Sequence, residues 1–429
     1  MLIGEVFIRS AVRIIPAFFL MILAHACASG PDYLLLNKQI NEGNCQLASE
    51  SIDIKRYGLN MRLNFLLDSA IVNMRCGNYE ESNNYLHQAD ELAEKLWTKS
   101  LTKQAASYLV NDYTIPYRGE DYEKAFINLF SSINYVLLGD LEEALVECRR
   151  LDSLLTLYNE KYKKKNVYKE DAFGRYLSGI IYEADRNMED AYIDYFKAYQ
   201  TFQDYEKNYG TKVPSLLIKD LIRAGKATGR QDEISSIKAE HEALDADEAG
   251  QSAKIVLIQL NGKAPVKKED KIFVLTSKGP LSLAFPRYEL SKPACSKSRM
   301  IVKGSSENKI SKLELVEDVN RIALKSLSDR KLRITAKALV RLVAKQAALE
   351  QITGDKDAQR VLNIINAAVL DRADTRSWRT LPGEIYMSYQ FVHEGRYGIY
   401  ADYCGRENFI GDVTVKAGET KFLLFDTIQ

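Results

Sequence analysis

Paired apolar stripes around a glycine turn constrain the fold of this chain more than any other feature. In residues 117–155, apolar side chains recur every three or four positions on both sides of Gly139-Asp140. Glycine permits the positive φ with which many helices end, and Asp140 can cap the next helix. The stretch therefore predicts two antiparallel helices. One such hairpin cannot bury both stripes alone, so it requires stacked neighbours.

The same pattern continues through residues 58–240. We expect further hairpins at residues 63–76 with 79–96, 173–183 with 188–202, and 216–227 with 232–239. In the 173–202 hairpin, small and aromatic residues resemble those of the tetratricopeptide repeat (TPR); they are Gly179, Tyr182, Ala191, Tyr195 and Ala198. The turns are unevenly spaced, and each gap exceeds the repeat's step of about 34 residues. The region is therefore expected to be TPR-like, with long inserted segments.

The sequence changes character after residue 240. Residues 241–253 are acidic, small and aperiodic, which indicates a linker. Residues 254–429 predict an α+β domain with strands in 255–285, helices in 313–370 and strands in 385–425. The last forty or so residues resemble the small β-sandwich modules of secreted proteins. The expected fold class is thus mixed: an N-terminal all-α TPR-like array of helical hairpins, then a C-terminal α+β domain with a small β-sheet or sandwich.

The N-terminus predicts export. Arg9 and Arg13 precede an apolar run at residues 14–23, which is too short for a stable membrane span. The run ends in Leu23-Ala24-His25-Ala26-Cys27, which resembles the lipobox of bacterial lipoproteins. This resemblance implies a signal peptide at 1–26, acylation of Cys27, and a lipidated tether with a first helix at 27–57. Two or three acyl chains anchor firmly, because each buried methylene contributes about 0.8 kcal/mol.

Cleavage without acylation remains an alternative for this segment. Ordinary secretory cleavage after Ala24-His25-Ala26 would leave a soluble secreted or periplasmic protein. If Cys27 is acylated, Ala28 and Ser29 follow it instead of an aspartate, which resembles sorting to the outer membrane. The expected location is therefore the periplasmic face of the outer membrane.

Charge and cysteine content exclude some classes of protein. The 59 basic and 58 acidic residues leave a net charge of +1, which argues against a nucleic-acid partner. The six cysteines include no Cys-x-x-Cys pair, so a zinc ribbon is not supported. Cys76 and Cys148 fall on apolar helical positions and are expected to be small core residues. A Cys45–Cys76 disulfide is an open alternative, because connectivity cannot be deduced from sequence.

Several stretches together resemble a family of bacterial TPR-type envelope lipoproteins. They are residues 116–124 (PYRGEDYEK), 138–140 with 147–150 (LGD, ECRR), 173–179 (FGRYLSG) and 373–382 (ADTRSWRTLP). The resemblance spans nearly the whole mature chain, and the segment around Trp378 is its most specific part. It implies an envelope lipoprotein without indicating an activity. Members are expected beside genes for outer-membrane activators of cell-wall synthases.

Two groups of residues are candidate contact sites. Arg376 and Arg379 flank Trp378, and arginine forks bind carboxylates while tryptophan stacks on sugars. The alternative, which we favour, is that Trp378 fills the junction between helix and sheet while the arginines pair with local acids. The second group recurs every four residues on one helix and comprises Arg333, Lys337, Arg341 and Lys345. It could contact anionic lipid or an acidic partner, but a solvated helix face is the simpler interpretation.

No catalytic constellation is evident in the sequence. After signal cleavage only His87, His241 and His393 remain, and none has the spacing of a triad or a metal site. We therefore expect no catalytic residue, metal or cofactor. The expected function is that of a lipid-anchored periplasmic adaptor that binds envelope proteins through the concave surface of its helical repeats. The family resemblance suggests cell-wall synthesis as its process. One alternative is an envelope carbohydrate-active or peptidoglycan-binding enzyme using Arg376, Trp378 and Arg379. Another is an assembly factor for a secretion system or surface organelle.

Overall fold

The computed structural model describes most of the expected mature chain. Its described residues are 30–107, 113, 115–161, 168–241, 252–276, 279–304, 308–352, 355–365 and 372–428. The predicted signal peptide and Cys27 lie outside the described residues, as does most of the predicted linker. Among the described residues, no helix is long and apolar enough to cross a membrane.

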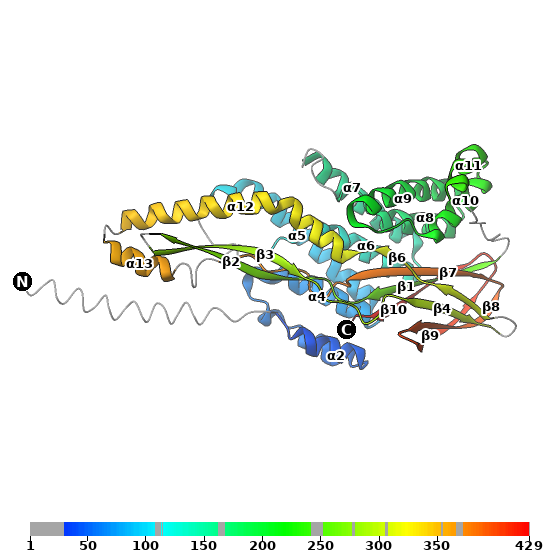
Figure 1. Ribbon diagram of the computed structural model, residues 1–429. Helices are drawn as coiled ribbons and strands as arrows, with labels where there is room; N and C mark the ends of the chain where they lie inside the picture. Colours follow the sequence, from blue (N-terminus) through cyan, green and yellow to red (C-terminus); the bar gives the residue numbers. More distant parts are fainter. Residues whose placement is uncertain are drawn as a thin grey trace, which may run out of the picture.

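Antiparallel helical hairpins build the first half of the molecule, which confirms the predicted array (Figure 1). The helices are α4 (Arg62–Arg75), α5 (Tyr79–Ser107), α6 (Asp121–Leu138), α7 (Leu141–Lys161), α8 (Ala172–Ala184), α9 (Met188–Tyr209), α10 (Ser215–Ala227) and α11 (Gln231–Glu240). Helix α5 is longer than expected: it was predicted to end at residue 96 and continues to Ser107.

Local sequence explains the hairpins. Gly139 ends α6 with a φ of 84°, and the Asp140 carboxylate accepts a hydrogen bond from the Glu143 amide, as expected of a cap. In the α8–α9 hairpin, a Cβ on Gly179 would lie 2.4 Å from the Tyr195 ring. Only glycine therefore lets this tyrosine pack so closely across the hairpin, which is the small-and-aromatic contact that the sequence indicates.

A small lobe precedes the array where the sequence predicts a tether and one helix. It contains α2 (Tyr33–Asn41), α3 (Cys45–Ser51) and two short 3-10 helices, η1 (Ile54–Arg56) and η2 (Leu59–Met61). The lobe has its own core, and a Cys45–Cys76 disulfide joins α3 to the end of α4. The expectation of a free core thiol at Cys76 is thus wrong, because the chain folds back and brings Cys45 within a Cα separation of 5.8 Å.

Two four-stranded sheets form a sandwich in the second half. One has the order β10-β1-β7-β6 and the other the order β5-β4-β8-β9. The strands are β1 (Ala253–Asn261), β4 (Ser298–Lys303), β5 (Asn308–Lys312), β6 (Glu314–Glu317), β7 (Glu384–Val392), β8 (Gly395–Tyr403), β9 (Arg406–Val415) and β10 (Thr420–Thr427). A Cys295–Cys404 disulfide, which the sequence analysis did not anticipate, closes one end.

Strand β1 lies at the centre of the fold. Its residues are buried on both faces, which explains why the sequence there is a continuous apolar run. Ile255 and Leu257 pack against the second sheet, whereas Val256, Ile258 and Leu260 point into the core shared with the helices. The layers are therefore helices, first sheet and second sheet.

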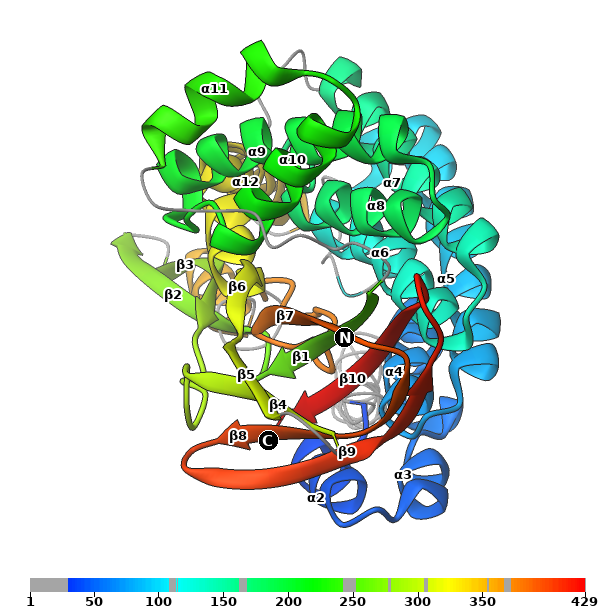
Figure 2. The ribbon, with the colours of Figure 1, turned by 90° about the vertical axis from the view of Figure 1, so that its right-hand side faces the viewer.

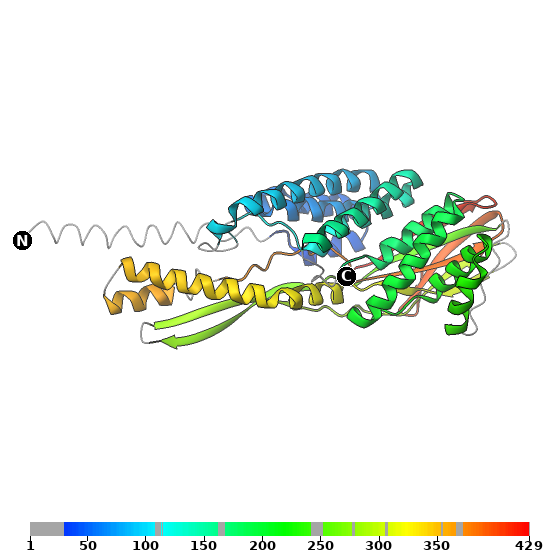
Figure 3. The same cartoon turned by 90° about the horizontal axis from the view of Figure 1, so that it is seen from above.

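An arm projects from one end of the molecule, as Figures 1 and 3 show. It consists of the hairpin β2 (Val266–Thr276) and β3 (Gly279–Glu289) with the helices α12 (Val319–Ile352) and α13 (Lys356–Ile365). The helices expected within residues 313–370 are α12 and α13, but the first of them begins only at Val319. Residues 314–317 form an edge strand, and a single uninterrupted helix follows, because no glycine or proline breaks the sequence between 319 and 352.

The helical array wraps around the first sheet instead of forming a separate domain (Figure 2). Its large apolar core includes residues of α4, α6, α8 and α10 together with β1 and β7. The first helix of each hairpin thus faces the chain's own C-terminal half. Within the described residues, the inward surface on which we expected a partner to bind is occupied intramolecularly.

Candidate functional site

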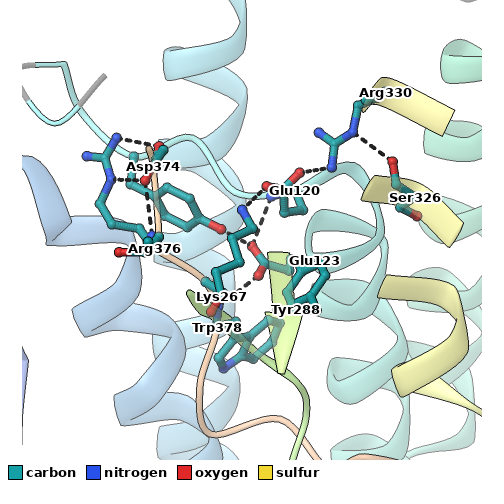
Figure 4. Close-up of polar contacts among 12 residues, drawn as sticks. Glu120, Glu123, Lys267, Tyr288, Ser326, Arg330, Asp374, Arg376 and Trp378 are labelled. Atoms are coloured by element: carbon teal, nitrogen blue, oxygen red, sulfur yellow. Dashed lines mark hydrogen bonds and ion pairs between the residues drawn. The ribbon is translucent and has the colours of Figure 1, made fainter. Parts of the chain in front are cut away.

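The two most distinctive sequence stretches meet at the junction between helices and sheet (Figure 4). Residues 116–124 lead into α6, and residues 373–382 lead into β7. The Trp378 amide donates to Glu123 Oε1 at 2.8 Å, and the Tyr117 hydroxyl donates to Glu123 Oε2 at 2.5 Å. Glu123 therefore joins segments that are separated by about two hundred and fifty residues in sequence.

Trp378 is a core residue of this junction. Its side chain is 1% exposed and packs 6.0 Å from the Phe130 ring, centroid to centroid. Its indole Nε1 donates to Thr380 Oγ1 at 3.0 Å, and the Thr380 hydroxyl donates in turn to Asp68 on α4. No ring face is open to a sugar, so the position matches the structural interpretation.

The flanking arginines also have internal partners. Arg376 pairs with Asp374 at 2.8 Å and donates to the Ile115 carbonyl oxygen at 2.8 Å. Its guanidinium also lies 5.3 Å from the Tyr117 ring centroid. Arg379 is half-buried, with its guanidinium 4.1 Å from the Tyr33 ring centroid. These contacts fasten the segment to the stretch that precedes α6 and to the lobe.

Glu120 is the centre of a buried ion cluster beside this junction (Figure 4). It pairs with Lys267 of β2 and Arg330 of α12. Burial opposes ionisation, but the two cations outweigh it and hold the pKa of Glu120 below its usual value. Burial raises the pKa of Glu123, against the opposing charge of Lys267. The cluster attaches the arm to the array.

A second buried ion cluster lies between α8, α10 and β1. Lys254 Nζ is 3.0 Å from Glu183 and 3.3 Å from Asp220, and Arg223 binds the same carboxylates at 2.6 Å and 2.5 Å. Burial opposes ionisation of Glu183, yet Lys254 and Arg223 lower its pKa to about 2. Tyr389 lies beside them, 4.1 Å from Lys254 Nζ. These side chains hold α8 and α10 against strand β1 of the sheet.

The free thiol, His87 and His241 each contact a different set of side chains. Burial raises the pKa of the free Cys148 thiol to about 12, so it is protonated at neutral pH. His87 Nε2 lies 3.6 Å from Glu147 Oε1, and this neighbouring carboxylate raises the histidine pKa. His241 contacts Tyr199 at the end of α11. The described residues contain no group of three metal-ligating side chains.

The basic stripe lies on α12 in the projecting arm. Arg333 is exposed and Lys337 is half-buried. The side chains of Arg341 and Lys345 lie outside the described part of the structure. Leu332, Leu339 and Val343 of the same helix are exposed, because α12 extends beyond the body of the molecule.

A polar groove opens on the outer side of the helical array. It is a cavity of about 210 Å³ between α7, α8 and α9. Both acidic and basic side chains line it, with Ile193 at 41% exposure as an apolar contact. The charged lining residues are Arg149, Asp152, Asp171, Arg175, Asp190, Asp194 and Lys197.

Arg175 organises the groove. It pairs with Asp152 and lies 3.7 Å from Asp194. The Ser178 hydroxyl donates to Asp194 at 2.6 Å, and burial raises the pKa of that carboxyl despite these favourable contacts. Sequence patterns do not reveal this site, because its members are single polar positions on, or at the start of, amphipathic helices. Only the stacking of two hairpins brings them together.

Comparisons with known proteins give no assignment. No protein-family model and no curated protein matches the chain. Two solved structures of kinesin light chain TPR-like repeats from Podosopora anserina overlap 49% of this chain and 91% of theirs, at 16% identity and a TM-score of 0.32. The chain's own hairpins, rather than this distant likeness, support its description as a TPR-like helical array joined to a β-sandwich.

Proposed function

We propose that this protein is a non-enzymatic scaffold, lipid-anchored outside the cytoplasm, that binds another envelope protein through the α7–α9 groove. The observation that carries the proposal is that the inward face of the array is filled by the chain's own sheet, whereas the outer groove is concave and charged. A lining of carboxylates and cations together with the exposed Ile193 suits a polar peptide segment with one apolar anchor.

Two further features support a location outside the cytoplasm. Both disulfides join distant parts of the chain, and such bonds persist mainly in oxidising compartments. The lipobox-like sequence before Cys27 supplies the anchor. Cys27→Ala should therefore release the protein from membranes and abolish acyl labelling. Retention of that variant in the membrane fraction would contradict the anchor.

Site-specific photocrosslinking tests the groove. A photoreactive residue at Ile193, introduced in cells of the native host, should trap one protein partner. The matched control is the same residue at Phe409 on β9, which is also exposed but lies in the sandwich. Arg175→Ala should reduce the yield, since it removes the cation that organises the carboxylates. Equal labelling at both positions, or recovery of glycan alone, would count against a groove-binding partner.

A role in cell-wall synthesis rests on the sequence resemblance alone. A partner that proves to be a cell-wall synthase or its activator would support that role. A component of a secretion system or surface organelle would instead favour the assembly-factor alternative. The identity of the trapped partner decides between them.

A further inference from the structure

The position at which the chain enters the folded lobe is fixed. The Gly30 amide donates to the Arg56 carbonyl oxygen at 3.1 Å, so the entering chain lies beside η1. Asp32 caps α2 immediately afterwards, accepting from the Leu34 amide at 3.0 Å. Cys27 is three residues before Gly30, and three extended residues reach about 10 Å. Any lipid on Cys27 therefore holds this corner of the lobe at the bilayer surface.

Large apolar side chains are exposed in the elements around that corner. Leu59 of η2 is 98% exposed, Leu34 of α2 is 76% exposed, and Leu35 and Ile54 are 45% and 47% exposed. The lobe's own core lies elsewhere and already contains Leu36, Ile40, Ala48, Ile52 and Tyr57. The exposed leucines and isoleucine are therefore not part of the lobe's core.

Basic side chains stand among these exposed residues. Lys55 and Arg56 belong to η1, and both are exposed. Within the described ranges, neither forms an ion pair. The neighbouring carboxylates of Asp32 and Asp53 accept hydrogen bonds from the backbone at the starts of α2 and η1. Exposed apolar side chains beside cations that form no ion pair are the pattern that binds an anionic lipid interface.

We propose that this corner is a membrane-contact patch formed by Leu34, Leu35, Ile54, Lys55, Arg56 and Leu59. Its occupant is the surface of an anionic bilayer. The apolar side chains enter the region between headgroups and acyl chains, and the two cations bind lipid phosphates. The inference rests on the proposed lipid anchor, which brings the patch within reach of the membrane.

The patch orients the molecule as well as adding affinity. The lobe is joined to α4 by the Cys45–Cys76 disulfide and by hydrogen bonds from the Tyr33 and Tyr57 hydroxyls to Asp68, at 2.7 Å and 2.8 Å. Because the lobe cannot turn freely on the array, contact at the patch fixes the direction in which the rest of the protein faces.

A fluorescent label at Leu59 tests the patch in the acylated full-length protein. The variant Leu59→Cys carries an environment-sensitive nitrobenzoxadiazole group, and Phe409→Cys, which replaces an apolar side chain on β9 that is 59% exposed, is the control. The introduced thiol reacts selectively, because four native cysteines are in disulfides and Cys148 is buried. Both proteins are reconstituted in vesicles of phosphatidylethanolamine and phosphatidylglycerol, with and without a spin-labelled lipid quencher.

We expect the label at residue 59 to brighten several-fold and to be quenched by the spin-labelled lipid, whereas the label at 409 stays in water. Flotation of the same vesicles reports the anchor independently. If the protein floats but the two labels behave alike, the patch is refuted and the anchor stands. If the protein carries no acyl chain and does not float, both inferences fail.

Discussion

Removal of the Lys254 ammonium group tests whether helices and sheet fold as one unit. Lys254 is 4% exposed on β1, and its charge compensates carboxylates of α8 and α10. Lys254→Met keeps the length of the side chain and removes the charge. Glu183 and Asp220 would then share a single cation, Arg223, in a buried site.

The pKa of Glu183 indicates how much stability the Lys254→Met variant should lose. Its folded value of about 2 lies roughly 2.5 units below the usual 4.5, which is worth about 3 kcal/mol of stability at neutral pH. This stability is fully present above pH 4.5 and is lost as the pH falls towards 2. Breaking one partner of a buried ion pair costs about 3–5 kcal/mol in other proteins. We therefore expect Lys254→Met to lose about 3 kcal/mol, and to begin acid unfolding at higher pH.

Urea unfolding of the oxidised protein measures this loss. With an m-value of about 3 kcal/mol/M, the midpoint should fall by roughly 1 M. The matched control is Lys421→Met on the adjacent strand β10, where the lysine is 46% exposed and pairs with Glu419 at 2.9 Å. Its loss should stay below about 1 kcal/mol. Equal small losses in both variants, or separate transitions for helices and sheet, would refute the reasoning.

Three further predictions concern the same junctions. Burial raises the pKa of Asp68 to about 6, so ionisation of this carboxyl should lower the unfolding free energy of the wild type by about 3 kcal/mol as the pH rises from 4 to 7. Asp68→Asn has no carboxyl to ionise, so its unfolding free energy should rise by that amount relative to the wild type over this range. Parallel pH profiles of the two unfolding free energies would contradict this prediction. Replacing both Cys45 and Cys76 by serine should cost about 2–4 kcal/mol of unfolding free energy, which an unchanged urea midpoint in non-reducing buffer would disprove. Trp378→Ala should cost about 3–5 kcal/mol, measured by the same unfolding assay; a loss under about 1 kcal/mol would show that the indole is not part of the core.

Periodicity in the sequence was sufficient for the helical half. The hairpins appear where apolar residues recur every three or four positions, and turns such as Gly139 lie where glycine predicts them. Edge strands were harder to detect. Strand β5 is only five residues long and alternates without a strongly apolar face, so it carries no clear pattern until it pairs with β4.

Among the candidate sites, too, the sequence indicated one and gave no signal for another. The sequence drew attention to Trp378, and its preferred interpretation as a filler between helix and sheet agrees with its burial against Phe130. The groove around Arg175 and Asp194 left no signal, because its members lie on three helices and are polar residues of ordinary amphipathic patterns.

The sequence by itself determined much of the local structure of this protein: the helical hairpins between residues 62 and 240, the places where they turn, and the strand at 255–260. Only the tertiary structure decided that the sheet occupies the inner side of the helical array. The reason is that hydrophobic burial is not directional, so an apolar stripe specifies that it must be covered and not what covers it. Pairings such as Lys254 with Glu183, and Glu120 with Arg330, made that choice between parts of the chain that no local pattern connects.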